Sequence, residues 1–140
     1  MTNVPDVKVG KYRLFRQIHG RGAFGEVHVA VCPAQTGDEP RVVWAVDDTN
    51  TSSIQPDADP LDASAALDGA LRGLVLAESL GAPAKDQVVR VTLVGVNVAD
   101  TEPSAVHAAA SAAVIRAFGL EDSCQLRYEN GWHYEPKPLG

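Results

Sequence analysis

The most informative stretch of this chain is Gln87–Gly119, which reads QVVRVTLVGVNVADTEPSAVHAAASAAVIRAFG. Its valine-rich first part, Gln87–Val94, predicts a buried strand. Gly95–Thr101 predicts a polar bend, and Glu102–Phe118 predicts an alanine-rich helix that Gly119 ends. A strand, a bend and a helix in this order predict an α+β or α/β layer in which the helix covers a sheet. The bend is the expected place for an exposed functional tip, because irregular segments between rigid elements lie on the surface.

Three strands are predicted before this stretch. Lys11–Ile18 predicts a first strand, and His19–Gly25 (HGRGAFG) predicts a glycine-rich turn. In Glu26–Cys32, valines alternate with other residues at a period of two, which is typical of a half-buried strand. Arg41–Val46 predicts the third strand, so Pro33–Pro40 is expected to connect antiparallel neighbours.

A loop and a helix are predicted between the third strand and Gln87. Asp47–Pro60 is rich in Asp, Thr, Ser and Pro, and a loop of this length is either mobile or functional. Asp59 and Pro60 are typical of a helix start, and Gly81 is typical of a helix end. The helical spacing indicates that one apolar stripe is buried: Ala63, Leu67, Ala70, Leu71, Leu74 and Ala77.

The C-terminal part of the chain predicts a hairpin. Cys124–Tyr128 and Trp132–Tyr134 flank Asn130-Gly131, and Asn-Gly is a strong hairpin signal because a type I′ turn needs positive φ at both positions. A chain of 140 residues predicts one α+β domain, with a core at residues 11–119 and the hairpin at residues 123–135.

Composition and charge narrow the classes of partner. The net charge is −6 and the twelve Lys and Arg residues are scattered, which disfavours DNA and any broad nucleic-acid-binding face. No apolar run approaches the roughly 20 residues that span a bilayer, and the N-terminus has no secretory pattern, so we expect a cytoplasmic protein without membrane contact. A local basic spot is left near the N-terminus: Lys8, Lys11, Arg13, Arg16, His19 and Arg21.

Patterns typical of catalytic or metal sites are missing from the sequence. No serine, lysine or cysteine nucleophile arrangement is visible. His107 is expected on a solvated helix surface, and the acids Asp57, Asp59 and Asp62 fit a loop and a helix start better than a magnesium site. We therefore expect no catalytic residue, no metal and no cofactor. The residues without metal-ligand spacing are His19, His28, His107, His133, Cys32 and Cys124, and both cysteines are expected to be reduced.

One segment resembles a protein kinase motif. Gly20–Val27 fits the glycine-rich loop that covers nucleotide phosphates. The strand Val42–Val46, which should carry the ATP-binding lysine, is followed by Asp47, an acid where a cation is needed. HRD-like and DFG-like motifs are absent from the sequence, so nucleotide binding is the less favoured interpretation.

The order of motifs over roughly Phe15–Phe118 resembles domain IV of translation elongation factor G, which has a ribosomal protein S5 domain 2-like fold. The similarity consists of a glycine-rich segment before a strand, a helix with Ala and Gly at fixed spacing, a V-x-V-x-L strand, and a tip loop before an alanine-rich helix. These motifs are, in order, Gly20–Val27 with Pro33, Ala66–Leu74, Val89–Leu93, Val98–Thr101 and Ala109–Ser111.

The resemblance implies three strands, a helix, a strand and a helix, with a tip formed by the glycine-rich turn and the loop before the last helix. In that family the tip enters the decoding centre of the ribosome and contacts the tRNA–mRNA duplex. We therefore expect a non-catalytic module that binds the ribosome or structured RNA. The tip residues carried over to this chain are Arg21, Ala23, Asn97, Asp100 and Thr101.

The chain departs from that family in ways that leave an alternative open. The tip histidine of the family falls at Asn97, an acid is missing at Leu93–Val94, and no GTPase motif is present. The alternative is a protein–protein interaction module, including a homodimer, that has kept the fold without the ribosomal role. In that case Trp132 and Tyr134 are the expected interface residues, because aromatic residues dominate interface energetics.

Overall fold

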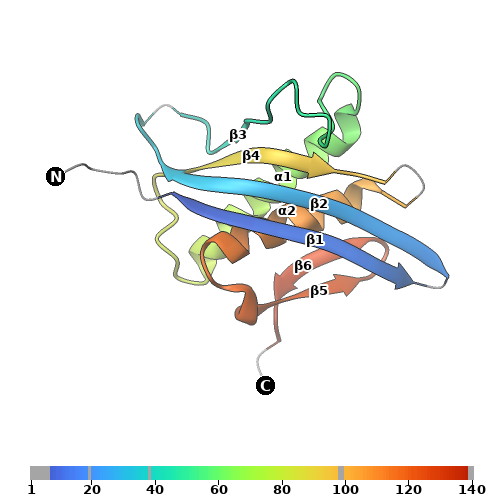
Figure 1. Cartoon of the computed structure of the whole chain (residues 1–140). Helices are drawn as coiled ribbons and strands as arrows, with labels where there is room; N and C mark the ends of the chain where they lie inside the picture. Colours follow the sequence, from blue (N-terminus) through green and yellow to red (C-terminus); the bar gives the residue numbers. More distant parts are fainter. Residues whose placement is uncertain (1–6, 19, 38, 98–99, 139–140) are drawn as a thin grey trace.

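The computed structural model describes residues 7–18, 20–37, 39–97 and 100–138, and at Ile18 and Arg21 it describes the backbone alone. A four-stranded sheet carries two helices on one face, and a two-stranded hairpin lies beside them (Figure 1). The predicted α+β class is confirmed. Among the described residues, no helix is long and apolar enough to cross a membrane.

The sheet has the strand order β1-β2-β4-β3. These strands are β1 at Lys8–Ile18, β2 at Arg21–Pro33, β3 at Val42–Trp44 and β4 at Gln87–Gly95. β2 is antiparallel to both β1 and β4, whereas β3 runs parallel to β4. The prediction that Pro33–Pro40 joins neighbouring strands is wrong, because β4 lies between β2 and β3.

The glycine-rich segment is mostly strand, so the predicted turn over His19–Gly25 is too long. His19 lies outside the described residues; Gly20 has a positive φ of 77°, and β2 begins directly after it. The glycines within β2 allow neighbouring segments of the chain to approach its backbone closely. A Cβ at Gly25 would lie 3.2 Å from the carbonyl carbon of Ala105, so glycine there permits the close approach of the helix that contains Ala105.

Helix α2 (Pro103–Ala117) lies in the middle of the molecule. It packs against β1 and β2 on one side and against α1 (Pro60–Ser79) on another, and α1 also contacts β4. From Ala105 to Ile115 every residue of α2 except His107 is buried. This position explains the alanine content, because a helix surrounded by other elements needs small apolar residues on all sides.

The face that α1 buries differs from the predicted stripe. Leu71 is 42% exposed, whereas Gly69 and Gly73 are buried against α2. At this contact the buried Ser111 Oγ donates a 2.7 Å hydrogen bond to the carbonyl oxygen of Gly69. A pattern of apolar side chains does not reveal such a contact, because glycine has no side chain to mark the buried face.

The predicted loop between β3 and α1 is confirmed, and it is anchored along the sheet. The backbone N–H of Ile54 donates to the carbonyl oxygen of Val94 at 2.9 Å, and Ser53 Oγ accepts from the N–H of Val94 at 2.9 Å. Ile54 is 8% exposed and belongs to the core. The loop therefore takes over hydrogen bonding to β4 where the three-residue strand β3 has ended.

The C-terminal hairpin is confirmed, with β5 at Cys124–Tyr128 and β6 at Trp132–Pro136. Asn130 and Gly131 have φ values of 53° and 130°. Trp132 and Tyr134, the expected interface residues, are 5% and 8% exposed, and β6 packs against α2. The expectation that they present an interface is therefore wrong, because both side chains are part of the core.

Candidate functional site: the tip and the open sheet face

The β1–β2 turn and the β4–α2 loop lie at the same end of the molecule (Figure 1). Hydrogen bonds tie the loop to β2. The N–H of Phe24 donates to the carbonyl oxygen of Asp100 at 3.1 Å, and Thr101 Oγ1 donates to the carbonyl oxygen of Phe24 at 2.9 Å. The same Thr101 oxygen accepts from the N–H of Asn97 at 2.7 Å. We call this end, formed by residues 20–24 and by 96, 97, 100 and 101, the tip.

The structure brings three of the five predicted site residues together at the tip. Asn97, Asp100 and Thr101 share the hydrogen bonds described above, and Asn97 is exposed. Only the backbone of Arg21 is described, and it lies in β2 beside this loop. Ala23 is 9% exposed and belongs to the core, so its methyl group does not form part of an exposed surface. The motif residues Val98 and Ala99 lie outside the described residues.

The glycine-rich segment has a packing role at the tip. A Cβ at Gly22 would lie 2.9 Å from the carboxyl carbon of Asp100, so the loop approaches the backbone of β2 closely. Residues 21–25 pair with β1 over their whole length, and the Asp100 carboxylate lies beside them. A kinase-type loop lays its N–H groups over phosphates. Here paired strand backbone and an acid occupy that region, which disfavours a phosphate.

Replacing Thr101 with valine is expected to loosen the tip without unfolding the core. The change removes the hydroxyl that bonds to both Phe24 and Asn97, and each hydrogen bond is worth about 1 kcal/mol. We expect the free energy of unfolding to fall by about 1–2 kcal/mol. NMR-detected hydrogen exchange should be faster at the amide of Asn97. Thr92→Val, which removes a hydroxyl bond to the carbonyl oxygen of His28, is the control and should leave that exchange unchanged. Unchanged exchange in Thr101→Val would contradict the role of this hydroxyl.

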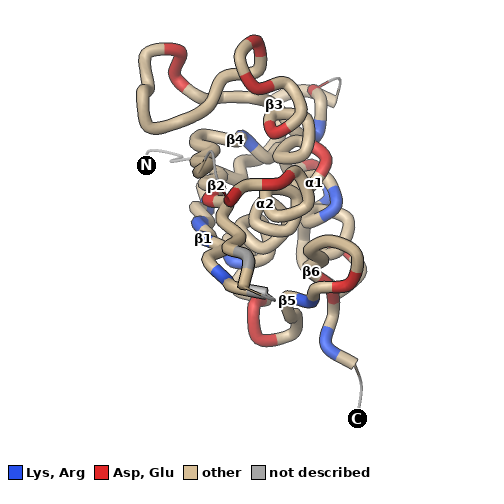
Figure 2. The backbone as a smooth tube through the Cα atoms, turned by 90° about the vertical axis from the view of Figure 1, so that its right-hand side faces the viewer, with Lys and Arg blue, Asp and Glu red and all other residues tan. Residues whose placement is uncertain are grey.

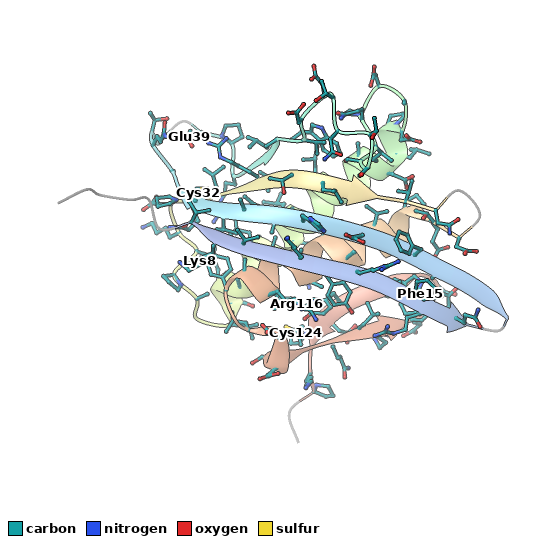
Figure 3. All side chains as sticks on the ribbon, viewed as in Figure 1. Lys8, Phe15, Cys32, Glu39, Arg116 and Cys124 are labelled. Atoms are coloured by element: carbon teal, nitrogen blue, oxygen red, sulfur yellow. The ribbon has the colours of Figure 1, made fainter. Side chains whose placement is uncertain are left out.

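The sheet face opposite the helices carries an aromatic pair near the tip. No described element covers this face, and Phe15 stands on it toward the tip end of β1 (Figures 1 and 3). The Phe15 and Phe24 rings meet edge to face with centroids 6.2 Å apart, and Phe15 is 61% exposed. The Arg13 guanidinium carbon lies 5.3 Å from the centroid of Phe24 and 5.9 Å from that of Phe15. A cation and two rings are thus held together at the surface.

Two further side chains complete this group. Glu26 Oε1 lies 3.8 Å from Arg13 Nε, and Glu26 Oε2 is 2.7 Å from His28 Nε2. We call Arg13, Phe15, Phe24, Glu26 and His28 the open-face cluster. Its members come from two adjacent strands, since Phe15 pairs with Phe24 and Arg13 with Glu26 in the register of β1 and β2.

Sequence reasoning missed the open-face cluster. The signal was present, because residues two apart in a strand share a face, and Lys11, Arg13 and Phe15 alternate with the buried Leu14. The pairing with Phe24 depends on where the turn lies, and the predicted turn was several residues too long. The same alternation places the basic residues of the predicted spot on two faces of β1, because Arg16 points toward the opposite face from Arg13.

The charges are distributed unevenly. Figure 2 shows Asp and Glu gathered in the loops beside β3, at the side of the molecule away from the hairpin, whereas Lys and Arg mark β1. The loop between β3 and α1 contributes Asp47, Asp48, Asp57 and Asp59 to the acidic side. β1 therefore lies at the less acidic side of a protein whose net charge is −6.

A hollow with a volume of about 430 Å³ lies between the starts of α1 and α2 and strand β6. His107 lines it and is half-buried rather than solvated, which corrects the expectation from sequence. Burial lowers the pKa of His107, and the Asp68 carboxylate opposes that shift. In the part of the chain that the structure describes, no three His, Cys, Asp or Glu side chains gather as metal ligands.

The two thiols are separate. Cys124 is buried and Cys32 is partly exposed, and they form no disulfide with each other. Burial raises the pKa of the Cys124 thiol, with Lys137 opposing the shift. A neutral buried thiol of this kind behaves as a small apolar side chain in the core.

Comparison with known proteins shows the fold and no family. No protein-family model matches the chain, and no curated protein matches it. A solved structure does match: the crystal structure of ttk003000868 from Thermus thermophilus, with a TM-score of 0.65 and 20% identity. The match covers 81% of this chain and 16% of that one, so this chain spans a small part of the length of its structural neighbour. At this identity the likeness shows the fold alone.

Proposed function

We propose that this protein is a non-catalytic binding module that recognises structured RNA, with the ribosome as the leading candidate. The tip and the open-face cluster form the binding surface. The observation that carries the proposal is the exposed Phe15–Phe24 pair, with Arg13 over both rings, beside a tip loop that is hydrogen-bonded to β2.

The chemistry of the cluster suits unpaired nucleotides. Proteins read RNA loops and ends by stacking unpaired bases on aromatic rings and on the planar guanidinium group of arginine. Phe15 offers an exposed ring, and Arg13 offers a cation that the Glu26 carboxylate holds in place at 3.8 Å. A protein with a net charge of −6 needs such specific contacts, because it cannot rely on general attraction to phosphates.

The position of the tip agrees with the resemblance to domain IV of elongation factor G. In that family the glycine-rich segment and the loop before the last helix together form the part that enters the ribosome. In this chain the corresponding segments are joined through Phe24, Asp100 and Thr101. The α+β fold, the order of motifs and the joined tip support the proposal.

The proposal is tested by co-sedimentation of the purified protein with ribosomes across a salt series. The double variant Phe15→Ala/Phe24→Ala should bind at least about tenfold more weakly, because each lost stacking contact costs about 1–3 kcal/mol. Leu61→Ala/Leu71→Ala is the matched control, since it removes two exposed apolar side chains from α1, and it should bind like the wild type. Wild-type protein that does not sediment with ribosomes at low salt would overturn the ribosomal assignment.

A second pair of variants separates the tip from the open face. Replacing Arg21 and Asn97 together should abolish sedimentation while the thermal midpoint stays nearly unchanged. Retained sedimentation of this variant, together with its loss in Phe15→Ala/Phe24→Ala, would place the binding surface on the open face alone.

One observation favours a second candidate, an interaction between two copies of this chain. Val9 and Phe15 are 60% and 61% exposed on the same strand, and no described element covers the sheet face that carries Phe15. A second copy packed on this face would bury both side chains. Light scattering decides between the candidates: a dimeric mass that becomes monomeric in Phe15→Ala favours self-association, and a monomeric wild type removes it.

A further inference from the structure

A groove separate from the tip runs between the edge strand β1 and the C-terminal hairpin, with a volume of about 570 Å³. β1 is an edge of the four-stranded sheet, because among the described strands it pairs with β2 alone. Arg116, from α2, lies below the edge of β1 and toward the hairpin (Figure 3). The groove is lined by, among others, Tyr12, Arg16, Arg116, Tyr128 and Trp132.

The hairpin side of the groove presents a ring in a fixed orientation. Tyr128 is 43% exposed, and its ring meets the buried ring of Trp132 with centroids 5.1 Å apart and an interplanar angle of 72°. Trp132 is 5% exposed, so it acts as a fixed support. An exposed ring that is held from behind loses little conformational entropy when a flat ligand stacks on it.

Two guanidinium groups are positioned by contacts that leave most of their N–H groups free. Arg116 Nη1 donates to the carbonyl oxygen of Lys11 at 3.0 Å, and its guanidinium carbon lies 5.0 Å from the Tyr12 ring centroid. Arg16 Nη1 donates to the carbonyl oxygen of Phe15 at 3.0 Å. Each guanidinium has five N–H donors. Neither forms an ion pair with a carboxylate among the residues that the structure describes.

The charge of the groove differs from that of the molecule. Two arginines and one acid, Glu121, line its described part, whereas the whole chain has a net charge of −6. Each of the two guanidinium groups is suited to a phosphate, which it can bind through more than one N–H group at once. The groove thus combines an anion site with a flat stacking surface.

We propose that this groove binds a single-stranded RNA segment, with one base on Tyr128 and the two phosphates that flank it at Arg16 and Arg116. The inference rests on the proposed function, because it names a binding site for an unpaired segment of the same RNA ligand. A free mononucleotide has the same chemistry, and the volume is within the range of small-ligand pockets.

The test uses fluorescence of the full chain. The chain contains two tryptophans, so in a Trp44→Phe background the emission comes from Trp132 behind the Tyr128 ring. The probes are AMP, a 5′-phosphorylated hexa-adenylate strand, the same strand in a duplex, and hexaglutamate. We expect the single strand to change the emission, AMP to bind more weakly, and the duplex and the peptide to have no effect. An equal effect of AMP and the strand would overturn the assignment to RNA and indicate a mononucleotide site.

Variants locate the site. Tyr128→Ala should weaken strand binding about fivefold or more, the lower end of the effect of losing one base–aromatic stack. With two phosphate contacts, the logarithm of the affinity should fall against the logarithm of the salt concentration with a slope of about −1.4. In Arg16→Gln/Arg116→Gln that slope should fall close to zero. Arg72→Gln/Lys85→Gln makes the same change in net charge outside the groove and should keep the wild-type slope.

The outcomes separate this inference from the proposed function. Wild-type protein that sediments with ribosomes but does not bind the hexa-adenylate strand would overturn the groove assignment alone. Strand binding without ribosome sedimentation would overturn the ribosomal assignment and leave the groove. Two results would show that the groove is not an RNA site. One is wild-type affinity for the strand in both Tyr128→Ala and Arg16→Gln/Arg116→Gln. The other is a change of Trp132 emission with hexaglutamate that is lost in Arg16→Gln/Arg116→Gln.

Discussion

Gly69→Ala is expected to lower the free energy of unfolding by about 2–3 kcal/mol, although the same change in an ordinary helix raises it by about 1 kcal/mol. The sign reverses because of the contact between α1 and α2. A Cβ at Gly69 would overlap the carbonyl oxygen of His107 and lie 2.9 Å from its carbonyl carbon. Backbone cannot move aside as a flexible side chain can, so the helices would have to separate.

Separation of the helices would also disturb the buried 2.7 Å hydrogen bond from Ser111 Oγ to the carbonyl oxygen of Gly69. The expected loss is measured by urea unfolding followed by circular dichroism. Asp68→Ala is the matched control, because its side chain is exposed on the same helix, and it should change the stability by no more than about 0.5 kcal/mol. Gly69→Ala as stable as the wild type would contradict this description of the helix contact.

Trp132→Ala is expected to cost about 3–5 kcal/mol, the range for removing a large aromatic side chain from a core. Trp132 is 5% exposed, and its backbone N–H donates to Ser104 Oγ at 3.1 Å, which joins the hairpin to the start of α2. Loss of the indole also removes the support of the Tyr128 ring. The hairpin is therefore expected to contribute to the stability of the whole chain rather than to fold as an appendage.

Thermal and urea unfolding measure this effect, and hydrogen exchange shows where it arises. The matched control is His133→Ala, because His133 is the exposed neighbour of Trp132 on the same strand, and it should stay within about 0.5 kcal/mol of the wild type. A small loss in Trp132→Ala, confined to exchange in β5 and β6, would show that the hairpin is independent of the core.

The elements with strong local signals were predictable from the sequence. The alanine-rich helix α2, the alternating valines of β2 and the Asn130-Gly131 turn each depend on neighbours in the chain. The order of the strands was not predictable in the same way. β4 enters the sheet between β2 and β3, so the pairing depends on contacts between segments far apart in the chain, for example Val29 with Val91.

The candidate site was predictable in part for the same reason. Asn97, Asp100 and Thr101 are close in the chain, and the resemblance to a known family placed them beside the glycine-rich segment. The inward direction of Ala23 and the pairing of Phe15 with Phe24 depend on the register of β1 and β2. A shift of one residue moves every side chain to the other face of a strand, so a turn predicted too long conceals an exposed aromatic pair.

The anchored loop between β3 and α1 also affects how copies of this protein can aggregate. Strand β3 has three residues, and the bonds from Ser53 and Ile54 to Val94 occupy the adjacent part of β4. Short or covered edges resist the addition of a strand from another molecule. The long edge of β1 is left as the place where a strand could be added. Edge-to-edge growth of the four-stranded sheet is then expected to stop at a pair of molecules joined through β1.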